Sequence, residues 1–158
     1  MVITGNERKH FMQERKEAGH FSENEVINRE KCANIMADLA PDGQEILEKH
    51  QADFGEILLH VLAGELITEP LIELFKFHTF PTDRIAKIEC YCQVIETMWK
   101  NGDADVVNVV DVTILERLSD EDEVWQQFGT FISDEFKQYI NNELLVTNLM
   151  MGGVRALD

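Results

Sequence analysis

Apolar residues recur every three or four positions along most of this chain, and this spacing restricts the fold more than any other feature of the sequence. In the stretch 103–123 the intervals are three, four and four, between Val107, Val110, Ile114 and Leu118. Such intervals place the side chains on one face of an α-helix. Further apolar residues widen this face: Val106, Val109, Val112 and Leu115. We therefore expect a helix that is buried on more than one side.

The same spacing predicts a series of helices in the rest of the chain. They are expected over 22–39, 44–62, 69–78, 81–100, 103–118, 119–128 and 133–145, with a short helix also compatible with 7–18. Four residues have the side chains and positions of helix N-caps, and these are Ser22, Asp103, Ser119 and Ser133. Ser22 and Ser119 are each followed three residues later by an acid, which is the pattern of a capping box.

Breaks between the helices are marked by turn residues. Pro41–Gly43 ends the first long helix, and Glu69–Pro70 places a proline in the first turn of another. Asn101–Gly102 is expected to stop the helix before it in a left-handed conformation. Because this connection is short, the helices on either side should form an antiparallel hairpin.

These elements predict an all-α protein of about six to seven helices, with antiparallel hairpins packed as a globular bundle or a short repeat-like stack. No regular self-similarity supports a true solenoid. Dense β-branched residues in 106–114 leave a buried strand as an alternative, but no partner strand is evident. The 158 residues suit a single domain, 1–158, in which 1–21 and 150–158 are candidates for poor order.

Charge is the dominant feature of the composition, because 30 acidic residues stand against 14 basic ones and the net charge is −16. The excess lies downstream, since 1–31 hold six acids and six bases whereas 103–158 hold twelve acids and three bases. Such a surface repels nucleic acids and anionic membranes. It attracts a basic protein and speeds its encounter. An apolar groove between helix pairs would serve a homodimer as well as such a partner.

Cysteine usage and hydropathy indicate a cytoplasmic protein. Three cysteines, an odd number, argue against a disulfide framework and favour a reducing compartment. The N-terminal segment MVITGNERKHFMQERK lacks the apolar core of a signal peptide. The longest apolar tract, 57–77, is interrupted by polar residues and proline, so it does not suit a membrane span.

No catalytic signature is present, and we expect neither an enzyme nor a cofactor. Gly-rich phosphate loops, nucleophile elbows and zinc-protease motifs are absent. Asp53, Glu56 and His60 would share a helix face and could hold a metal ion. However, di-metal bundles use a Glu–His spacing of three, and the spacing here is four with no second copy. Cys90 and Cys92 diverge on a helix, which favours a core role over a metal site.

A resemblance to a known family rests on three segments between Phe54 and Tyr139. They read FGEILLHVLAGELITEPLIEL, IETMWKNGDADVVNVVDVTILERLSDE and WQQFGTFISDEFKQYI. This part of the chain resembles a bacterial domain family of unknown function, most specifically in WKNGDADVVNVVDVTILERL. That family implies no catalytic residues. In size, acidity and helical content the chain is also similar to immunity proteins of bacterial toxin systems, including contact-dependent growth inhibition.

The second resemblance implies a function in toxin neutralisation. Immunity proteins of this kind are small, acidic and cytosolic, and they neutralise basic nuclease toxins. We therefore hypothesise an immunity-type protein that binds and neutralises a cognate basic toxin domain of the nuclease type. Its carboxylates would stand in for phosphates and pair with Lys and Arg of the toxin. The predicted contact residues are Asp103, Asp105, Asp111, Glu116, Asp120, Glu121, Asp122, Glu123 and Trp125.

Several of these residues also have a purely structural interpretation. Asp103 and Asp120 are the weakest candidates because both are expected to cap helices. The acids of 120–123 are equally suited to the first turn of a helix, where the helix dipole favours negative charge. Trp125 would be a binding anchor only if it is exposed.

Two other classes of function remain open. An acidic helical scaffold would recruit some other basic protein and give no protection against a toxin. A metal-dependent enzyme built on Asp53, Glu56 and His60 is the least favoured alternative, and a metal analysis of the purified protein would test it.

Overall fold

The computed structural model describes residues 25–77, 83–144 and 156–157. These residues form seven helices packed together and no strand, which confirms the predicted all-α class. Three of the seven are continuous helices that contain a π-helical segment, labelled η. The seven run as α2 (Arg29–Ala37), α3 (Gly43–Phe54), α4–η1–α5 (Leu59–Ala63, Gly64–Thr68, Glu69–Lys76), α6 (Arg84–Asn101), α7–η2–α8 (Ala104–Asn108, Val109–Leu115, Glu116–Leu118), α9 (Asp122–Thr130) and α10–η3 (Asp134–Tyr139, Ile140–Leu144).

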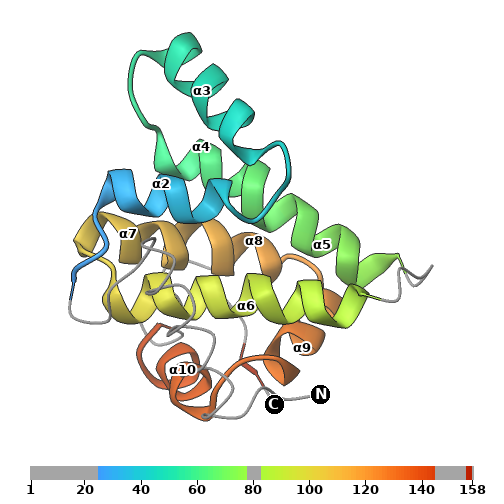
Figure 1. Cartoon of the computed structure of the whole chain (residues 1–158). Coiled ribbons are helices and arrows are strands. Elements are labelled where there is room, and N and C mark those ends of the chain that lie inside the picture. Colours follow the sequence, from blue (N-terminus) through green and yellow to red (C-terminus); the bar gives the residue numbers. More distant parts are fainter. Residues whose placement is uncertain (1–24, 78–82, 145–155, 158) are drawn as a thin grey trace.

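Two long helices form the centre of the fold (Figure 1). α6 and the helix α7–η2–α8 run antiparallel beside each other, which confirms the hairpin predicted across Asn101–Gly102. α2 and the helix α4–η1–α5 pack against this hairpin, α9 packs against α5, and α3 projects from the body above α4 (Figure 1).

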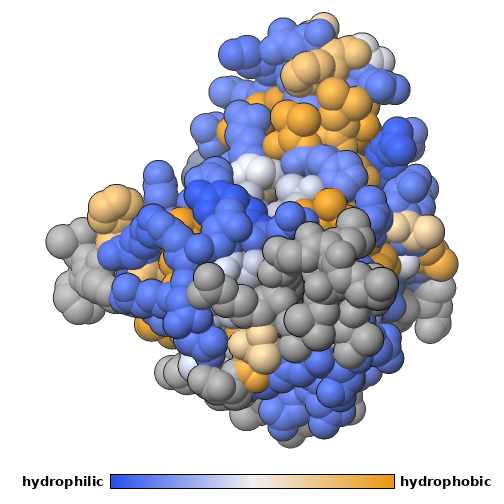
Figure 2. All heavy atoms as spheres, turned by 180° about the vertical axis from the view of Figure 1, so that it is seen from behind, coloured by the Kyte–Doolittle hydropathy of each residue, from blue (hydrophilic) through white to orange (hydrophobic). Residues whose placement is uncertain are grey.

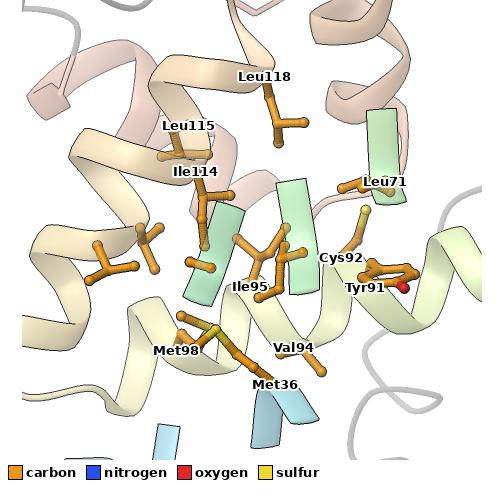
Figure 3. Packing of buried hydrophobic residues seen from close by; sticks show 14 of the residues in the cluster. Met36, Leu71, Tyr91, Cys92, Val94, Ile95, Met98, Ile114, Leu115 and Leu118 are labelled. Atoms are coloured by element: carbon orange, nitrogen blue, oxygen red, sulfur yellow. The ribbon is translucent and has the colours of Figure 1, made fainter. Parts of the chain in front are cut away.

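The core lies where these helices meet. Met36 of α2, Leu71 of α5, Ile95 of α6 and Ile114 of η2 are all fully buried in one apolar cluster (Figure 3). Each residue comes from the apolar face that the three-and-four spacing defines. Burying a side chain of this size contributes about 1.5–3 kcal/mol, so this cluster supplies much of the driving force for folding.

The first described helix begins later than the sequence pattern indicates. It starts at Arg29 with Asn28 as N-cap, whereas Ser22 lies outside the described residues. Ile27 is extended instead of helical: its N–H donates to the carbonyl of Asn101 at 2.8 Å, and its own carbonyl accepts from Asp103 at 2.9 Å. These long-range bonds hold Ile27 against the hairpin turn, and a helix starting at residue 22 would forfeit them.

The predicted helix 44–62 is wrong, because α3 ends at Phe54. Gly55 has a φ of 74°, the left-handed conformation that commonly ends helices. The next helix then continues without interruption from Leu59 to Lys76, so Pro70 lies inside a helix and not at its start. Gly64–Thr68 is π-helical, and this wider turn relieves the clash that a proline ring makes with a preceding carbonyl.

The predicted strand alternative for 106–114 is wrong, since this stretch is helical. Val109–Leu115 forms a π-helical segment, and five of its seven residues are β-branched. β-Branched side chains crowd the preceding turn of an α-helix, so the same residues that suggested a strand occur where the helix widens.

The capping predictions are confirmed in part. The side chains of Asp103 and Ser133 accept hydrogen bonds from the N–H groups of Val106 and Phe136, as N-caps do. Ser119 is not an N-cap: its hydroxyl donates to the carbonyl of Glu116 at 2.7 Å, so it ends one helix and does not begin the next. The cap position of α9 is Glu121.

Gly102 follows α6, but its φ of −71° is not left-handed, so that expectation is wrong. A glycine is required there for another reason: an added Cβ would lie 2.3 Å from the carbonyl oxygen of Met98 and 2.6 Å from Val106. Near the C-terminus, Leu157 is buried and exchanges two hydrogen bonds with Asn141. Apart from Ala156 and Leu157, the segments 1–21 and 150–158 lie outside the described residues, so the expectation of poor order there stays a prediction.

Within the described ranges, none of the helices has the length and apolar character that crossing a membrane would demand.

Candidate functional site

The nine predicted contact residues do not form one surface. The structure divides them into three groups: an edge at the end of α8 and the start of α9, the N-terminal end of α7, and the interior of the protein. The first group is Glu116, Asp120, Glu121, Asp122 and Glu123.

Five of the predicted acids and one neighbour form what we call the acidic edge. α5 lies beside the turn from α8 to α9, and two ion pairs connect them. Arg117 lies 3.0 Å from Glu69, and Lys76 lies 2.5 Å from Glu121. Glu69 of α5 is therefore the sixth carboxylate of this edge, which also holds the two bases. The acidic edge consists of Glu69, Glu116, Asp120, Glu121, Asp122 and Glu123.

The ion pairs of the acidic edge are exposed and weakly held. Arg117 also lies 3.7 Å from Asp120, so this one guanidinium serves two carboxylates. Side chains in these pairs are between 38% and 62% exposed. Exposed pairs of this kind contribute about 0–1 kcal/mol each. The six carboxylates and two bases give the edge a net charge of −4, and a basic partner can replace Arg117 and Lys76 at little cost.

The second group lies at the opposite end of the same helix. Asp105 forms an exposed ion pair with Arg29 at 3.6 Å, and Asp103 is the N-cap of α7. The helix 104–118 separates them from the acidic edge by its whole length, about 20 Å at 1.5 Å per residue. Asp103 and Asp105 are therefore not part of the acidic edge.

Asp111 belongs to the third group, because its half-buried carboxylate is held by Tyr139. Both of its oxygens accept from the hydroxyl of Tyr139, at 2.9 and 2.8 Å. Burial raises the pKa of Asp111, and the hydrogen bond from Tyr139 lowers it. Burial and the neighbouring Asp111 both raise the pKa of Tyr139. This pair connects η2 to α10, which is a structural role.

Trp125 is fully buried and stacks on Phe128, with ring centroids 5.6 Å apart. The condition under which it would anchor a partner is therefore not met. Its apolar spacing with Val124 and Phe128 reflects the core-facing side of α9.

The residues of the metal alternative do not share a helix. Gly55 separates Asp53, in α3, from Glu56 in the following loop, and His60 lies in α4. The imidazole of His60 contacts the hydroxyl of Thr113 across the α4–η2 contact. The described residues hold no cluster of three or more His, Cys, Asp or Glu side chains that could bind a metal ion. Cys32 and Cys92 are buried core residues, and burial raises the pKa of Cys32 to about 12.

The sequence pattern missed an apolar patch at the connection of α3 and α4. Figure 2 shows apolar side chains gathered on the surface there. Phe54 is 51% exposed and Val61 is 47% exposed. Both were expected in the core-facing stripe of a single helix 44–62, and the break at Gly55 turns them outward. Gly55 was the sequence signal for this break, but glycine is also tolerated inside helices, so it did not identify the break by itself.

His50 holds this connection in place. Its Nε2 accepts a hydrogen bond from the N–H of Leu58 at 2.9 Å, and its ring lies 4.8 Å from that of Phe54. The histidine itself is buried. His50 therefore fixes the loop between α3 and α4, which carries the patch.

Comparison with known proteins gives a family and nothing beyond it. No curated protein and no solved structure matches the chain. A family model described as a domain of unknown function, DUF7674, matches residues 33–146. This confirms the resemblance to a family of unknown function and extends it beyond the segment 54–139. The likeness to immunity proteins stays a prediction. Because the match spans well over half of the sequence, the chain belongs to the DUF7674 family of domains of unknown function.

Proposed function

We propose that this chain is a protein-binding module that recognises a basic partner through the acidic edge. In its specific form, the module is an immunity-type protein that neutralises a cognate basic toxin domain, of the nuclease type. The observation that carries the proposal is the composition of the edge: six carboxylates lie on α5, α8, α9 and the turn from α8 to α9, and the two bases among them form exposed pairs. Asp103, Asp105, Asp111 and Trp125 are left out of this surface.

The physical basis is complementarity of charge. A nuclease must carry Lys and Arg to hold the phosphates of its substrate. Carboxylates spaced along a rigid edge can occupy the same cationic groups and so exclude the substrate. Long-range attraction between the net charge of −16 and such a surface accelerates the encounter. Tight complexes of this kind reach dissociation constants of about 10⁻¹³ M.

The test begins with the reading frame immediately upstream of this one. Its C-terminal domain is expressed alone and together with this protein. If the proposal is correct, the domain is basic, stops growth when alone, and co-purifies harmlessly with this chain. Absence of both toxicity and co-purification would contradict the immunity role.

Charge-reversal variants then locate the surface. The edge variant Glu116→Lys, Asp120→Lys, Glu123→Lys reverses one helical, one turn and one first-turn acid of the edge. The matched control Glu30→Lys, Glu48→Lys, Glu56→Lys reverses three acids in equivalent local positions on α2, α3 and the following loop. Both variants change the net charge equally. We expect the edge variant to slow association at least tenfold more than the control does.

Two results would reject the edge as the binding surface. One is an equal loss of association rate in both variants, which would show that only the net charge matters. The other is unchanged binding by the edge variant. Stopped-flow kinetics measure the association rate of each variant at low and at physiological salt. The part of the rate that comes from charge steering should shrink at the higher salt because salt screens the charges.

A second candidate function is an acidic scaffold for another basic protein of the cell. The exposed patch at Phe54 and Val61 favours it, because an apolar centre with acidic neighbours such as Asp53 and Glu56 is typical of protein interfaces. This candidate predicts no protection against the upstream domain. It also predicts that the substitutions Phe54→Ser and Val61→Ser abolish capture of the partner, while the edge variant retains it.

A further inference from the structure

A groove of about 590 Å³ lies between α5, the first half of α6 and the connection from α2 to α3. This volume is in the range of sites that bind small organic molecules. Its walls are mostly apolar, with Leu39 and Pro41 on one side and Pro70, Leu74 and Phe77 on the other. The groove is separate from the α8–α9 turn, on which most of the acidic edge lies.

α6 supplies the polar part of the lining. Arg84, Lys87 and Tyr91 follow one another at intervals of three and four residues, so they project from one face of the helix. Arg84 is held by its Nε, which donates to the carbonyl of Leu74 at 2.6 Å. Lys87 is about half exposed and lies 3.5 Å from Asp83 in a solvent-exposed pair. Two of the 14 bases of this acidic chain therefore line one groove.

The hydroxyl of Tyr91 is a hydrogen-bond donor on a residue that lines this groove. The residue is 8% exposed. In Figure 3 this hydroxyl points away from the apolar cluster that surrounds Ile95. Burial above all, with Cys90 and Asp42, raises the pKa of Tyr91, so the phenol keeps its proton. A protonated phenol can donate a hydrogen bond to an anionic group in the groove.

Two further features restrict the ligand. Helical side chains lean toward the N-terminus, so Tyr91 leans toward Lys87, and both can donate to one anionic group. Glu73 lines the opposite wall and disfavours a second negative charge. Apolar walls on both sides require an apolar body. From these observations we propose that the groove binds a small monocarboxylate with an apolar body, whose carboxylate accepts from Lys87 and Tyr91.

Isothermal titration with decanoate, used below its micelle concentration, tests this directly. Decanol lacks the charge, acetate lacks the apolar body, and decyl phosphate carries additional negative charge. We expect decanoate to bind about tenfold more tightly than decanol, because a hydrogen bond to a charged group is worth that factor. Acetate should bind more than tenfold more weakly than decanoate because it lacks the apolar body. Decyl phosphate should bind more weakly than decanoate because Glu73 disfavours its additional charge. Equal binding of decanol and decanoate, or no binding of decanoate, would overturn the proposal.

Variants place the ligand in the groove. Lys87→Met and Tyr91→Phe remove one donor each and should weaken decanoate binding about tenfold, while Leu74→Trp fills the groove and should abolish it. The matched control Lys49→Met removes an exposed lysine of α3 that does not line the groove and should bind normally. Circular dichroism confirms that each variant is folded. Normal binding by Lys87→Met and Tyr91→Phe, or by Leu74→Trp, would show that decanoate binds elsewhere.

Discussion

Three glycines in this chain differ in whether they could carry a side chain, and only the structure separates them. An added Cβ at Gly102 would lie 2.3 Å from a backbone oxygen, whereas at Gly64 its nearest contact would be at 3.8 Å. Gly55 has open space around it but a positive φ, which L-residues adopt at a cost.

Substitution of Gly102 and Gly64 by alanine should change stability in opposite directions. Gly102→Ala forces the end of α6 and the start of α7 apart, so we expect a loss of about 1–3 kcal/mol in the free energy of unfolding. Gly64→Ala adds a good helix former without a clash and should gain about 0.5–1 kcal/mol. Urea unfolding of both variants measures this. A stable Gly102→Ala protein would show that the turn relaxes easily.

The Asp111–Tyr139 pair predicts a pH dependence at single-residue scale. Because burial raises the pKa of Asp111 above its unfolded value of 3.8, the native state binds more protons in the window above 3.8. The contribution of Asp111 to stability therefore falls as the pH rises through that window. Tyr139→Phe removes the hydrogen bond that lowers this pKa, so the pKa should rise further and the fall should become larger.

We therefore expect Tyr139→Phe to destabilise the protein by about 1 kcal/mol at about pH 7 and by less at about pH 4. Urea unfolding at the two pH values measures the difference. The control is Tyr139→Phe made in an Asp111→Asn background: this background has no carboxylate at position 111, so adding Tyr139→Phe should cost the same at both pH values. An equal loss at both values in the single variant would contradict the prediction.

At the scale of the element, α3 is the helix least attached to the body. Of its twelve residues only Gly43, Leu47 and His50 are buried. α6, by contrast, buries seven side chains along its length and lies at the centre of the fold. Helices with few buried contacts open locally at a lower free energy than the global one.

Hydrogen exchange should resolve this difference. We expect the amides of α3 to exchange through local opening and those of α6 only through global unfolding. His50→Ala removes the acceptor for the N–H of Leu58 and the ring contact with Phe54, so it should speed exchange in α3 about tenfold and leave α6 unchanged. Lys49→Ala, at an exposed neighbouring position, is the control. Equal acceleration in α3 and α6 would mean that α3 unfolds only with the whole domain.

At the scale of the whole molecule, the net charge of −16 determines how stability depends on salt. Repulsion among 30 acids opposes the compact state, and the ion pairs between described residues are exposed and individually weak. Screening by salt weakens both the repulsion and the ion pairs, but the total repulsion among the acids is the larger of the two energies.

Added salt should therefore stabilise the protein. Between about 10 mM and about 1 M sodium chloride the Debye length falls from about 30 Å to about 3 Å, and we expect the melting temperature to rise by several degrees. Calorimetry across this range checks the prediction, and the edge variant should show a smaller rise because its net charge is reduced. A fall in the melting temperature would show that the ion pairs outweigh the repulsion.

The sequence by itself determined the features that depend on residues close together in the chain. The three-and-four spacing determined the all-α class, and Asp103 and Ser133 are N-caps as predicted because a cap contacts a backbone N–H only three residues away. The charge excess follows from composition alone. The short connection at Asn101–Gly102 determined the central hairpin, since two helices joined so tightly have few other arrangements.

Only the tertiary structure decided which of these helical faces and acids reach solvent. Asp111 is held by Tyr139, 28 residues away, and Glu69 joins the acidic edge through Arg117, 48 residues away. Trp125 is buried on α9, which packs on α5 and α8, and the groove exists only where three separate segments meet. Burial and pairing over such separations are set by how whole helices pack together. Local spacing does not indicate which other helix each face packs against.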